Sequence, residues 1–166
     1  MALGPAFDGV HHAVIPGRGG TGMAARATGR DRGEEGDMSR TPQEQANLDF
    51  CTRMYHEMLF RFDASKIDEF LADDYIQHST AATGGKEGLR DFFQNRAENF
   101  PDVEFAIKAS MVDGDFTMFH IHTIRHPGDP GMSIIDYFRL EGGKVKEHWE
   151  VVQEIPETLP HDNGIF

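Results

Sequence analysis

Ser133-Ile-Ile-Asp-Tyr-Phe-Arg-Leu140 is followed by Glu141-Gly-Gly143 and then by Lys144-Val-Lys-Glu-His-Trp-Glu-Val-Val-Gln153. Two runs of aliphatic and aromatic residues joined by a Gly-Gly turn are typical of a β-hairpin. Within the first run, Asp136 is the one acidic residue among large apolar neighbours. Along a strand, alternation places it on the same face as Ile134, Phe138 and Leu140.

A carboxylate on an otherwise apolar face of a strand is unfavourable, because it loses water without gaining a partner. Residues kept in such places are often catalytic acids or bases, so Asp136 is the first candidate for a functional residue. The alternative is a structural role, on an edge strand or in a pair with a cation.

The segments before this hairpin predict helices first and strands second. Thr41-Pro-Gln-Glu44 has the pattern of a capping box, and a broad apolar stripe then recurs at helical spacing to about Phe62. A short helix is expected over residues 64–71, an extended segment over residues 73–78, and a third helix over residues 86–100.

From Val103 onward the apolar period changes to two, which indicates strands. Asp113-Gly114 predicts a tight turn into a strand over residues 116–125, and a Gly/Pro-rich loop over residues 126–131 leads to the Asp136 strand. Helices followed by hairpin-connected strands predict an α+β fold, in which a curved antiparallel sheet has helices packed across one face.

The first 37 residues differ from the rest, since they hold nine of the eighteen glycines and no apolar period. We expect residues 1–37 to be a disordered extension rich in Gly and Arg, residues 38–157 to be the folded domain, and residues 158–166 to be a C-terminal tail. Met38 stands just before the first helix signal, and we hypothesise that the natural start codon lies there.

Composition narrows the classes of partner. The 166 residues include 28 acidic and 16 basic side chains, and a net charge of -12 repels nucleic acid and anionic membrane surfaces. No apolar run approaches the roughly 20 residues of a membrane span, so we expect a soluble, cytoplasmic protein. The single cysteine, Cys51, falls on the apolar stripe of the first helix and is expected to pack in the core.

Several segments together resemble a known family. They are Tyr75-Ile-Gln-His78, Gly85-Lys-Glu-Gly88, Val112-Asp-Gly-Asp115, Ile135-Asp-Tyr-Phe-Arg139 and Gly143-Lys-Val-Lys-Glu-His-Trp149. From about Pro42 to Pro156 the chain resembles the SnoaL-like polyketide cyclases, in the superfamily similar to nuclear transport factor 2. The resemblance implies a cone-shaped α+β barrel with helices across it and an apolar pocket at its open end.

The resemblance also implies site residues and an oligomer. The cyclases use an aspartate acid/base on a central strand, matched by Asp136, and a histidine from the preceding strand, matched by His122 or His120. They commonly form homodimers through the outer face of the sheet, where we expect apolar residues such as Phe119 and Ile121. No cofactor is expected.

The histidines can be considered from spacing alone. His120 and His122 lie two apart on a strand, so they share a face and can converge on one ligand, although strand histidines are more often structural. Between His148 and Trp149 only one can face the pocket, and the parity of Val145 and Val151 favours Trp149. The expected ligand-binding residues are His78, Tyr75, Trp149, Phe138, Met118 and Tyr55.

A metal site is the competing interpretation of the same histidines. The spacing of these residues partly mimics a cupin metal motif, with Gly114 followed by His120-Ile-His122 and then by His126. A histidine replaces the usual glutamate, the second cupin motif is absent, and helices precede the sheet. We therefore expect no metal.

The favoured function is general acid/base chemistry on a small, mostly apolar carbonyl compound. Asp136 would remove a proton next to the carbonyl, and His122 or His120 would donate to the developing oxyanion. The same groups serve aldol cyclisation, isomerisation or dehydration. The alternative is a non-catalytic module that binds a small ligand in the same pocket.

Overall fold

A computed structural model describes residues 40–166, and the predicted extension over residues 1–37 lies outside them. Helix α1 (Pro42–Glu57) begins at the predicted capping box. The Thr41 hydroxyl accepts from the Glu44 amide at 3.2 Å, and the Glu44 carboxylate accepts from the Thr41 amide at 2.7 Å. These bonds satisfy amides that the first turn of a helix leaves unpaired.

The remaining helical segments follow the predicted order with shifted ends. The first helix was expected to continue to about Phe62, but α1 ends at Glu57, and a short 3₁₀ turn, η1 (Leu59–Arg61), leads into Phe62, which has a left-handed φ of 50°. Two short segments, η2 (Ala64–Lys66) and α2 (Ile67–Phe70), form the second helical region. Helix α3 (Gly85–Asn99) is the third.

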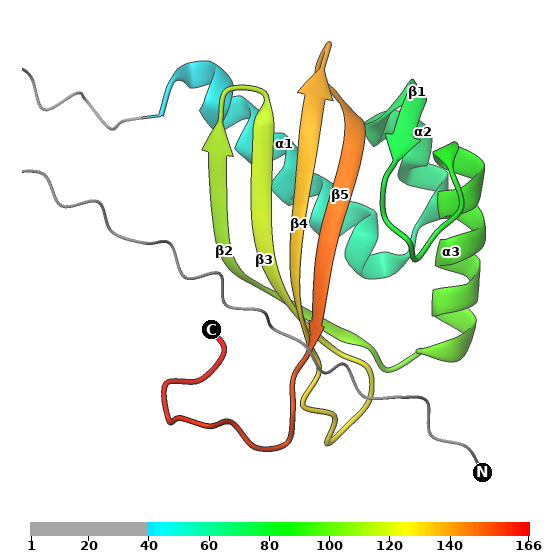
Figure 1. Ribbon diagram of the computed structural model, residues 1–166. Helices are drawn as coiled ribbons and strands as arrows, with labels where there is room; N and C mark the ends of the chain where they lie inside the picture. Colours follow the sequence, from blue (N-terminus) through cyan, green and yellow to red (C-terminus); the bar gives the residue numbers. More distant parts are fainter. Residues whose placement is uncertain (1–39) are drawn as a thin grey trace, which may run out of the picture. The chain divides into compact units, whose positions relative to one another are not determined.

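Five strands form one open sheet in the order β1-β5-β4-β3-β2. They are β1 (Leu71–Gln77), β2 (Glu104–Asp113), β3 (Phe116–Ile124), β4 (Met132–Glu141) and β5 (Lys144–Glu154). Helices α1 and α3 lie on one side of the curved sheet, with α1 crossing behind the strands and α3 beside the β1 edge (Figure 1).

The α+β fold class is therefore confirmed, with two differences in detail. The sheet does not close, because β1 and β2 are both edges. Strand β1 also runs parallel to β5, whereas β2, β3, β4 and β5 pair antiparallel in hairpin order. A tight hairpin forces antiparallel pairing, but β1 and β5 are joined through the rest of the domain, so their direction is not fixed in this way.

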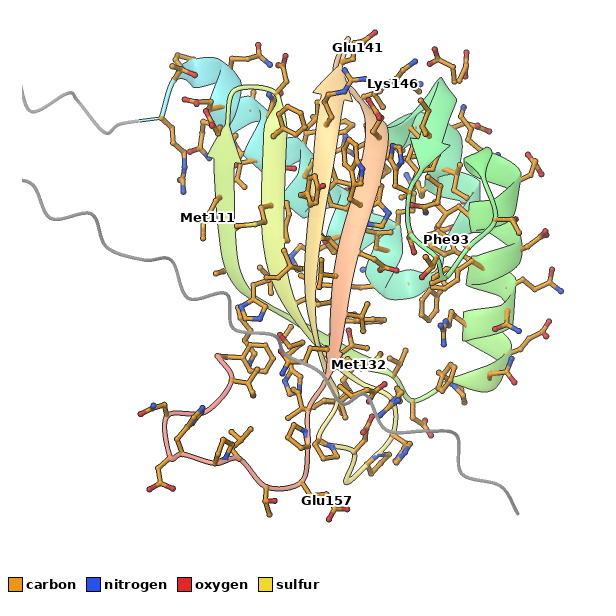
Figure 2. All side chains as sticks on the ribbon, in the orientation of Figure 1. Phe93, Met111, Met132, Glu141, Lys146 and Glu157 are labelled. Atoms are coloured by element: carbon orange, nitrogen blue, oxygen red, sulfur yellow. The ribbon has the colours of Figure 1, made fainter. Side chains whose placement is uncertain are left out.

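An irregularity in the β4–β5 hairpin decides which side chains point inward. Leu140 pairs with Val145, but Arg139 pairs with Glu147, so Lys146 is an extra residue in β5. Lys146 lies close to the turn of this hairpin (Figure 2). Because a β-bulge shifts the alternation by one residue, every residue of β5 beyond it faces the side opposite to that predicted from Val145.

The core lies between the helices and the concave face of the sheet. Phe93 projects from α3 towards the sheet (Figure 2) and is 1% exposed. Cys51 is fully buried, as predicted, and accepts a hydrogen bond from the Thr117 hydroxyl at 3.3 Å. No helix in residues 40–166 has the length and apolar character needed to cross a membrane.

Candidate functional site

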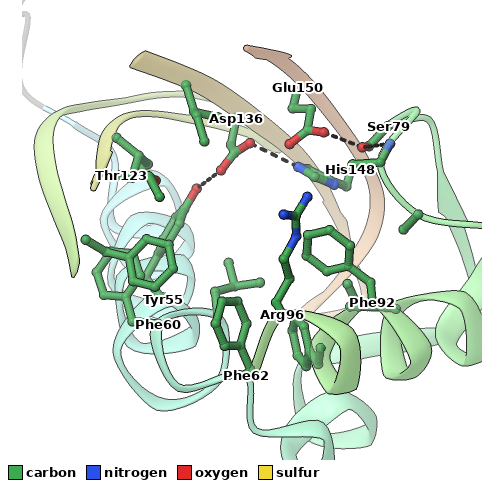
Figure 3. Close-up of a pocket in the computed structure, with 18 of the residues that line it drawn as sticks. Tyr55, Phe60, Phe62, Ser79, Phe92, Arg96, Thr123, Asp136, His148 and Glu150 are labelled. Atoms are coloured by element: carbon green, nitrogen blue, oxygen red, sulfur yellow. Dashed lines mark hydrogen bonds and ion pairs between the residues drawn. The ribbon is translucent and has the colours of Figure 1, made fainter. Parts of the chain in front are cut away.

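A cavity of about 310 Å³ opens between α1, α3 and the concave face of the sheet (Figure 3). Its wall is mostly apolar, and three of its polar side chains, Asp136, His148 and Glu150, lie where β4 and β5 run side by side. Such a pocket, with a few polar groups converging in an apolar wall, is typical of a small-molecule site. The aromatic part of the lining is formed by Tyr55, Phe60, Phe62, Tyr75, Phe92, Phe93, Phe100, Phe105 and Phe138.

Asp136 lies in the wall of this cavity and is 9% exposed. The Tyr55 hydroxyl donates to its Oδ2 at 2.7 Å, and the Nε2 of His148 lies 3.3 Å from its Oδ1. Burial, and then the nearby Asp136 charge, raise the pKa of Tyr55 well above its usual value. Tyr55 is therefore a neutral phenol that donates to the carboxylate.

The orientation of His148 is fixed from its other side. Its Nδ1 lies 2.8 Å from Oε1 of Gln77, and the backbone amide of Ser79 donates to the same Oε1 at 3.2 Å. An atom that accepts from a backbone N–H is the amide oxygen, so Nδ1 of His148 must be the donor. Nε2 is then the ring nitrogen directed at Asp136 and at the cavity.

Glu150 adds a second carboxylate beside this pair. It is the β5 partner of Asp136 in the sheet, and its side chain accepts a hydrogen bond from the Ser79 hydroxyl. One ligand atom each from Asp136, His148 and Glu150 lie within 4.8 Å of one another. This combination of an imidazole and two carboxylates is the one place in residues 40–166 with three side chains suited to hold a divalent cation.

The structure separates the residues that the sequence singled out. Asp136, Tyr55, Tyr75 and Phe138 all line the cavity, and their roles there stay predictions. Asp136 does not lack polar neighbours, as its own strand suggested, because His148 and Glu150 approach from β5. The cost of burying its charge is reduced by its hydrogen bonds with Tyr55 and His148.

His120, His122 and Met118 lie on the opposite face of the sheet, so the expectation that either histidine joins Asp136 is wrong. Asp136 pairs with Phe119, and directly paired residues of neighbouring strands share a face. Phe119 and Ile121 therefore point inward, where they are 0% and 2% exposed, and not outward as expected.

On that outer face both histidines have structural partners. The Nε2 of His120 lies 2.7 Å from the Ser133 hydroxyl, and the Nε2 of His122 lies 2.9 Å from the Pro130 carbonyl oxygen. The ring of Phe166 packs within 5 Å of both, at centroid distances of 4.9 and 4.7 Å. Neither belongs to the three-residue cluster suited to a metal, so the cupin-like alternative has no support in residues 40–166.

Trp149 and His78 also lie outside the cavity. Trp149 stacks against Tyr137 at 4.8 Å and against His78 at 4.5 Å, with the rings nearly parallel. The bulge at Lys146 is the reason that His148, and not Trp149, faces inward. His78 pairs with Glu147 at 2.9 Å on the same outer surface.

The sequence alone missed four cavity residues that carry charge or can carry it: His148, Glu150, Arg96 and Arg125. The segment Glu147-His148-Trp149 was noticed, but its parity was taken from Val145. Only the register of the β4–β5 hairpin could have corrected it, because no local residue pattern announces a bulge.

Comparison of the sequence with models of known protein families gives a match to the SnoaL-like domain over residues 52–148. This chain belongs to the SnoaL-like family. No curated protein sequence matches the chain closely enough to count as a relative.

Solved structures show how widely the SnoaL-like fold is shared. A proposed SnoaL-like polyketide cyclase from Jannaschia sp. has a TM-score of 0.57 and 22% identity, covering 69% of this chain and 90% of its own. A loop-truncated variant of IdmH from Streptomyces antibioticus has a TM-score of 0.56 and 23% identity, covering 64% and 91%. AclR from Streptomyces galilaeus, a proposed hydroxylase, has a TM-score of 0.56 and 20% identity, covering 68% and 82%. At these identities the likeness shows the fold alone.

Proposed function

We propose that this SnoaL-like protein is an enzyme that uses Asp136 and His148 for acid/base chemistry on a small, mostly apolar carbonyl compound. The observation that carries the proposal is the hydrogen-bonded chain from Tyr55 through Asp136 and His148 to Gln77 in the wall of an apolar cavity. A structural ion pair needs no cavity beside it, whereas a catalytic pair does.

In the proposed reaction the substrate carbonyl group inserts between the side chains of Asp136 and His148. At 3.3 Å the bond between His148 and Asp136 is long, so its replacement by bonds to a substrate costs little. The carboxylate of Asp136 takes the proton from the carbon next to the carbonyl. The Nε2–H of His148 donates to the carbonyl oxygen, which becomes an enolate oxygen as the proton leaves carbon.

Tyr55 and Gln77 position the two reacting groups. The Tyr55 hydroxyl occupies one oxygen of Asp136, which leaves the other oxygen directed at His148 and the substrate. Gln77 accepts from Nδ1 and thereby keeps a proton on that nitrogen, so Nε2 is the atom that exchanges protons. The enolate so formed is the shared intermediate of aldol cyclisation, isomerisation and dehydration.

Proton exchange tests the proposal without knowledge of the natural substrate. Neutral ketones that fit an apolar cavity, such as 1-tetralone, are incubated with the protein in D₂O, and the loss of the α-proton signal is followed by NMR. Wild-type protein should accelerate this exchange, and Asp136→Asn should reduce the acceleration at least about 100-fold. Asp91→Asn, an exposed change on α3, is the matched control and should have no effect.

The alternative function, ligand binding without catalysis, makes a different prediction for the same experiment. Ketones would then raise the melting temperature of the protein but would not exchange their protons faster in its presence. That result would contradict the enzymatic proposal.

The proposal also includes a cytoplasmic location, which the single, buried and unpaired Cys51 supports.

A further inference from the structure

Two arginines line the cavity, and only one of them is engaged by carboxylates. Arg125 is held by Asp129 at 2.7 Å and by Glu154 at 2.9 Å. Arg96, on the last turn of α3, has no hydrogen-bond or ion-pair partner for its side chain among residues 40–166. A half-buried guanidinium without a carboxylate in a largely apolar cavity is therefore the unexplained charge of this site.

The position of the Arg96 guanidinium is defined by aromatic rings. Its central carbon lies 4.9 Å from the centre of the Phe92 ring and 5.2 Å from that of Phe100. Cation–π contacts of this kind favour a planar guanidinium over an ammonium. In the close-up, the Arg96 side chain extends from α3 towards His148, with its nitrogens directed into the cavity (Figure 3).

A guanidinium held in this way is suited to one class of ligand group. Its N–H donors match the two oxygens of a carboxylate, and such charge-assisted pairs are about twice as strong as neutral hydrogen bonds. The surrounding wall offers apolar and aromatic surface, with the Asp136–His148 pair on the sheet side. The cavity thus has one place for a carbonyl, one for an anion and an apolar space around them.

We propose that Arg96 binds a carboxylate of the ligand, so that the substrate class is small, apolar keto acids. This inference rests on the proposed function, because it assumes that the reacting carbonyl lies at Asp136 and His148. Arg96 acts here as a specificity-determining residue, and it takes no part in moving the proton.

A competing explanation for Arg96 is that it balances the charge of Glu150, which also lines the cavity. No ion pair joins the two side chains within 4.0 Å among the described residues, and Glu150 already accepts from Ser79. If charge balance were the whole role, ligands with and without a carboxylate would bind equally well, and the melting temperature would respond similarly to Arg96→Gln and Glu150→Gln.

Matched ligands and matched variants separate these explanations. The probes are 3-benzoylpropionate, a keto acid, and its primary amide, which has the same shape without the charge. Their dissociation constants are measured by calorimetry for wild type, Arg96→Gln, Arg96→Lys and Arg61→Gln. Arg61 is exposed and lies outside the cavity lining, so Arg61→Gln removes the same charge elsewhere.

The wild-type protein should bind the acid at least about tenfold more tightly than the amide, since a charge-assisted bond contributes that much. Arg96→Gln should abolish this preference, Arg96→Lys should keep part of it, and Arg61→Gln should keep all of it. Equal binding of both probes by wild type, binding of neither, or a preference that survives Arg96→Gln would overturn the inference.

Proton exchange of 1-tetralone, which carries no carboxylate, is measured on the same variants. Exchange by wild type that Arg61→Gln keeps shows that the Asp136 chemistry operates, and binding of the amide by Arg96→Gln shows that the cavity of this variant is folded. Loss of the acid preference in Arg96→Gln, with the preference kept in Arg61→Gln, therefore supports the role of Arg96. Absence of exchange in wild type contradicts the proposed function, whatever the two probes show.

Discussion

Asp136 shows how far a single residue could be interpreted from the sequence. Its apolar neighbours on β4 marked it as a functional candidate, and it does lie in the wall of the cavity. Its partners could not be predicted, because Tyr55 comes from α1 and His148 from β5. Tyr55 lies 81 positions from Asp136 in the sequence and His148 lies 12 positions from it. Only the three-dimensional arrangement brings both side chains to the same carboxylate.

The histidines illustrate the opposite case. Spacing along β3 correctly placed His120 and His122 on one face, but spacing within one strand does not say which face. The pairing of Phe119 with Asp136 decides it, and this pairing depends on the length and conformation of the loop over residues 126–131. A one-residue difference in that register would have reversed the result.

At the same scale, the structure predicts the chemistry of Cys51. Burial raises the pKa of its thiol to about 12, although the Thr117 hydroxyl bond partly opposes this. Native protein at pH 8 should therefore not react with a thiol reagent such as DTNB, while protein in denaturant should react at one equivalent.

The raised pKa of Cys51 also has a consequence for stability. The unfolded chain loses the thiol proton from about pH 8.5, whereas the folded protein retains it. The contribution of this group is thus complete below pH 8.5 and declines as the pH rises towards 12. Rapid labelling of native protein at pH 8 would contradict the burial of Cys51.

Among the elements, α1 has a start that could be predicted, because that start is encoded locally. Thr41 and Glu44 form the capping box that the sequence announced. Glu44 also accepts from the amide of Gly114, in the turn between β2 and β3, at 3.1 Å. This second contact ties the helix to the sheet and could not be inferred from the capping pattern.

The cap of α1 leads to a prediction on stability. Thr41→Ala removes the acceptor for the Glu44 amide and should lower the free energy of unfolding by about 1 kcal/mol. Thr41→Ser keeps the hydroxyl and should restore most of this loss. Urea denaturation of the three proteins measures it, and an unchanged midpoint for Thr41→Ala would mean that the cap contributes nothing.

The loop between β3 and β4 depends on a buried carboxylate. Asp129 accepts from the guanidinium and the backbone amide of Arg125 and from the amide of Gly131. These bonds, first that from the Arg125 side chain, hold the pKa of Asp129 well below its usual range. The stabilisation is therefore present above about pH 4 and is lost as the pH falls towards the lower pKa of the folded state.

We expect Asp129→Asn to lower the melting temperature at pH 7, and to do so by a smaller amount at pH 3. Thermal unfolding of wild type and variant across this range gives the difference directly. The direction of the change with pH is the informative result. If the difference in melting temperature between wild type and Asp129→Asn grows on acidification, the fold does not stabilise Asp129 as a carboxylate.

For the whole molecule, the open question is what covers the outer face of the sheet. Apolar side chains of β2, β3, β4 and β5 share this surface, and several of them are exposed. Exposed apolar patches on a sheet are typical of interaction surfaces. They include Met111, Phe116, Tyr137, Trp149 and Val151.

We propose that two copies of the chain pair through this surface to form a homodimer. Light scattering should give twice the mass of one chain at micromolar concentration, and Val151→Glu should shift the protein to monomer. Ala97→Glu, on the exposed side of α3, should leave the mass unchanged. Trp149 is the single tryptophan, so its fluorescence should change on dilution. A wild-type monomer would contradict the proposal.

The central claim is that Asp136 acts together with His148, and the most direct test exchanges one histidine at a time. The rate of α-proton exchange of 1-tetralone is measured for wild type, His148→Phe and His122→Phe, with melting temperatures to confirm folding. We predict that His148→Phe lowers the rate at least about 100-fold. His122→Phe, on the outer face, should stay within about twofold of wild type. Loss of exchange in His122→Phe with full activity in His148→Phe would contradict the account.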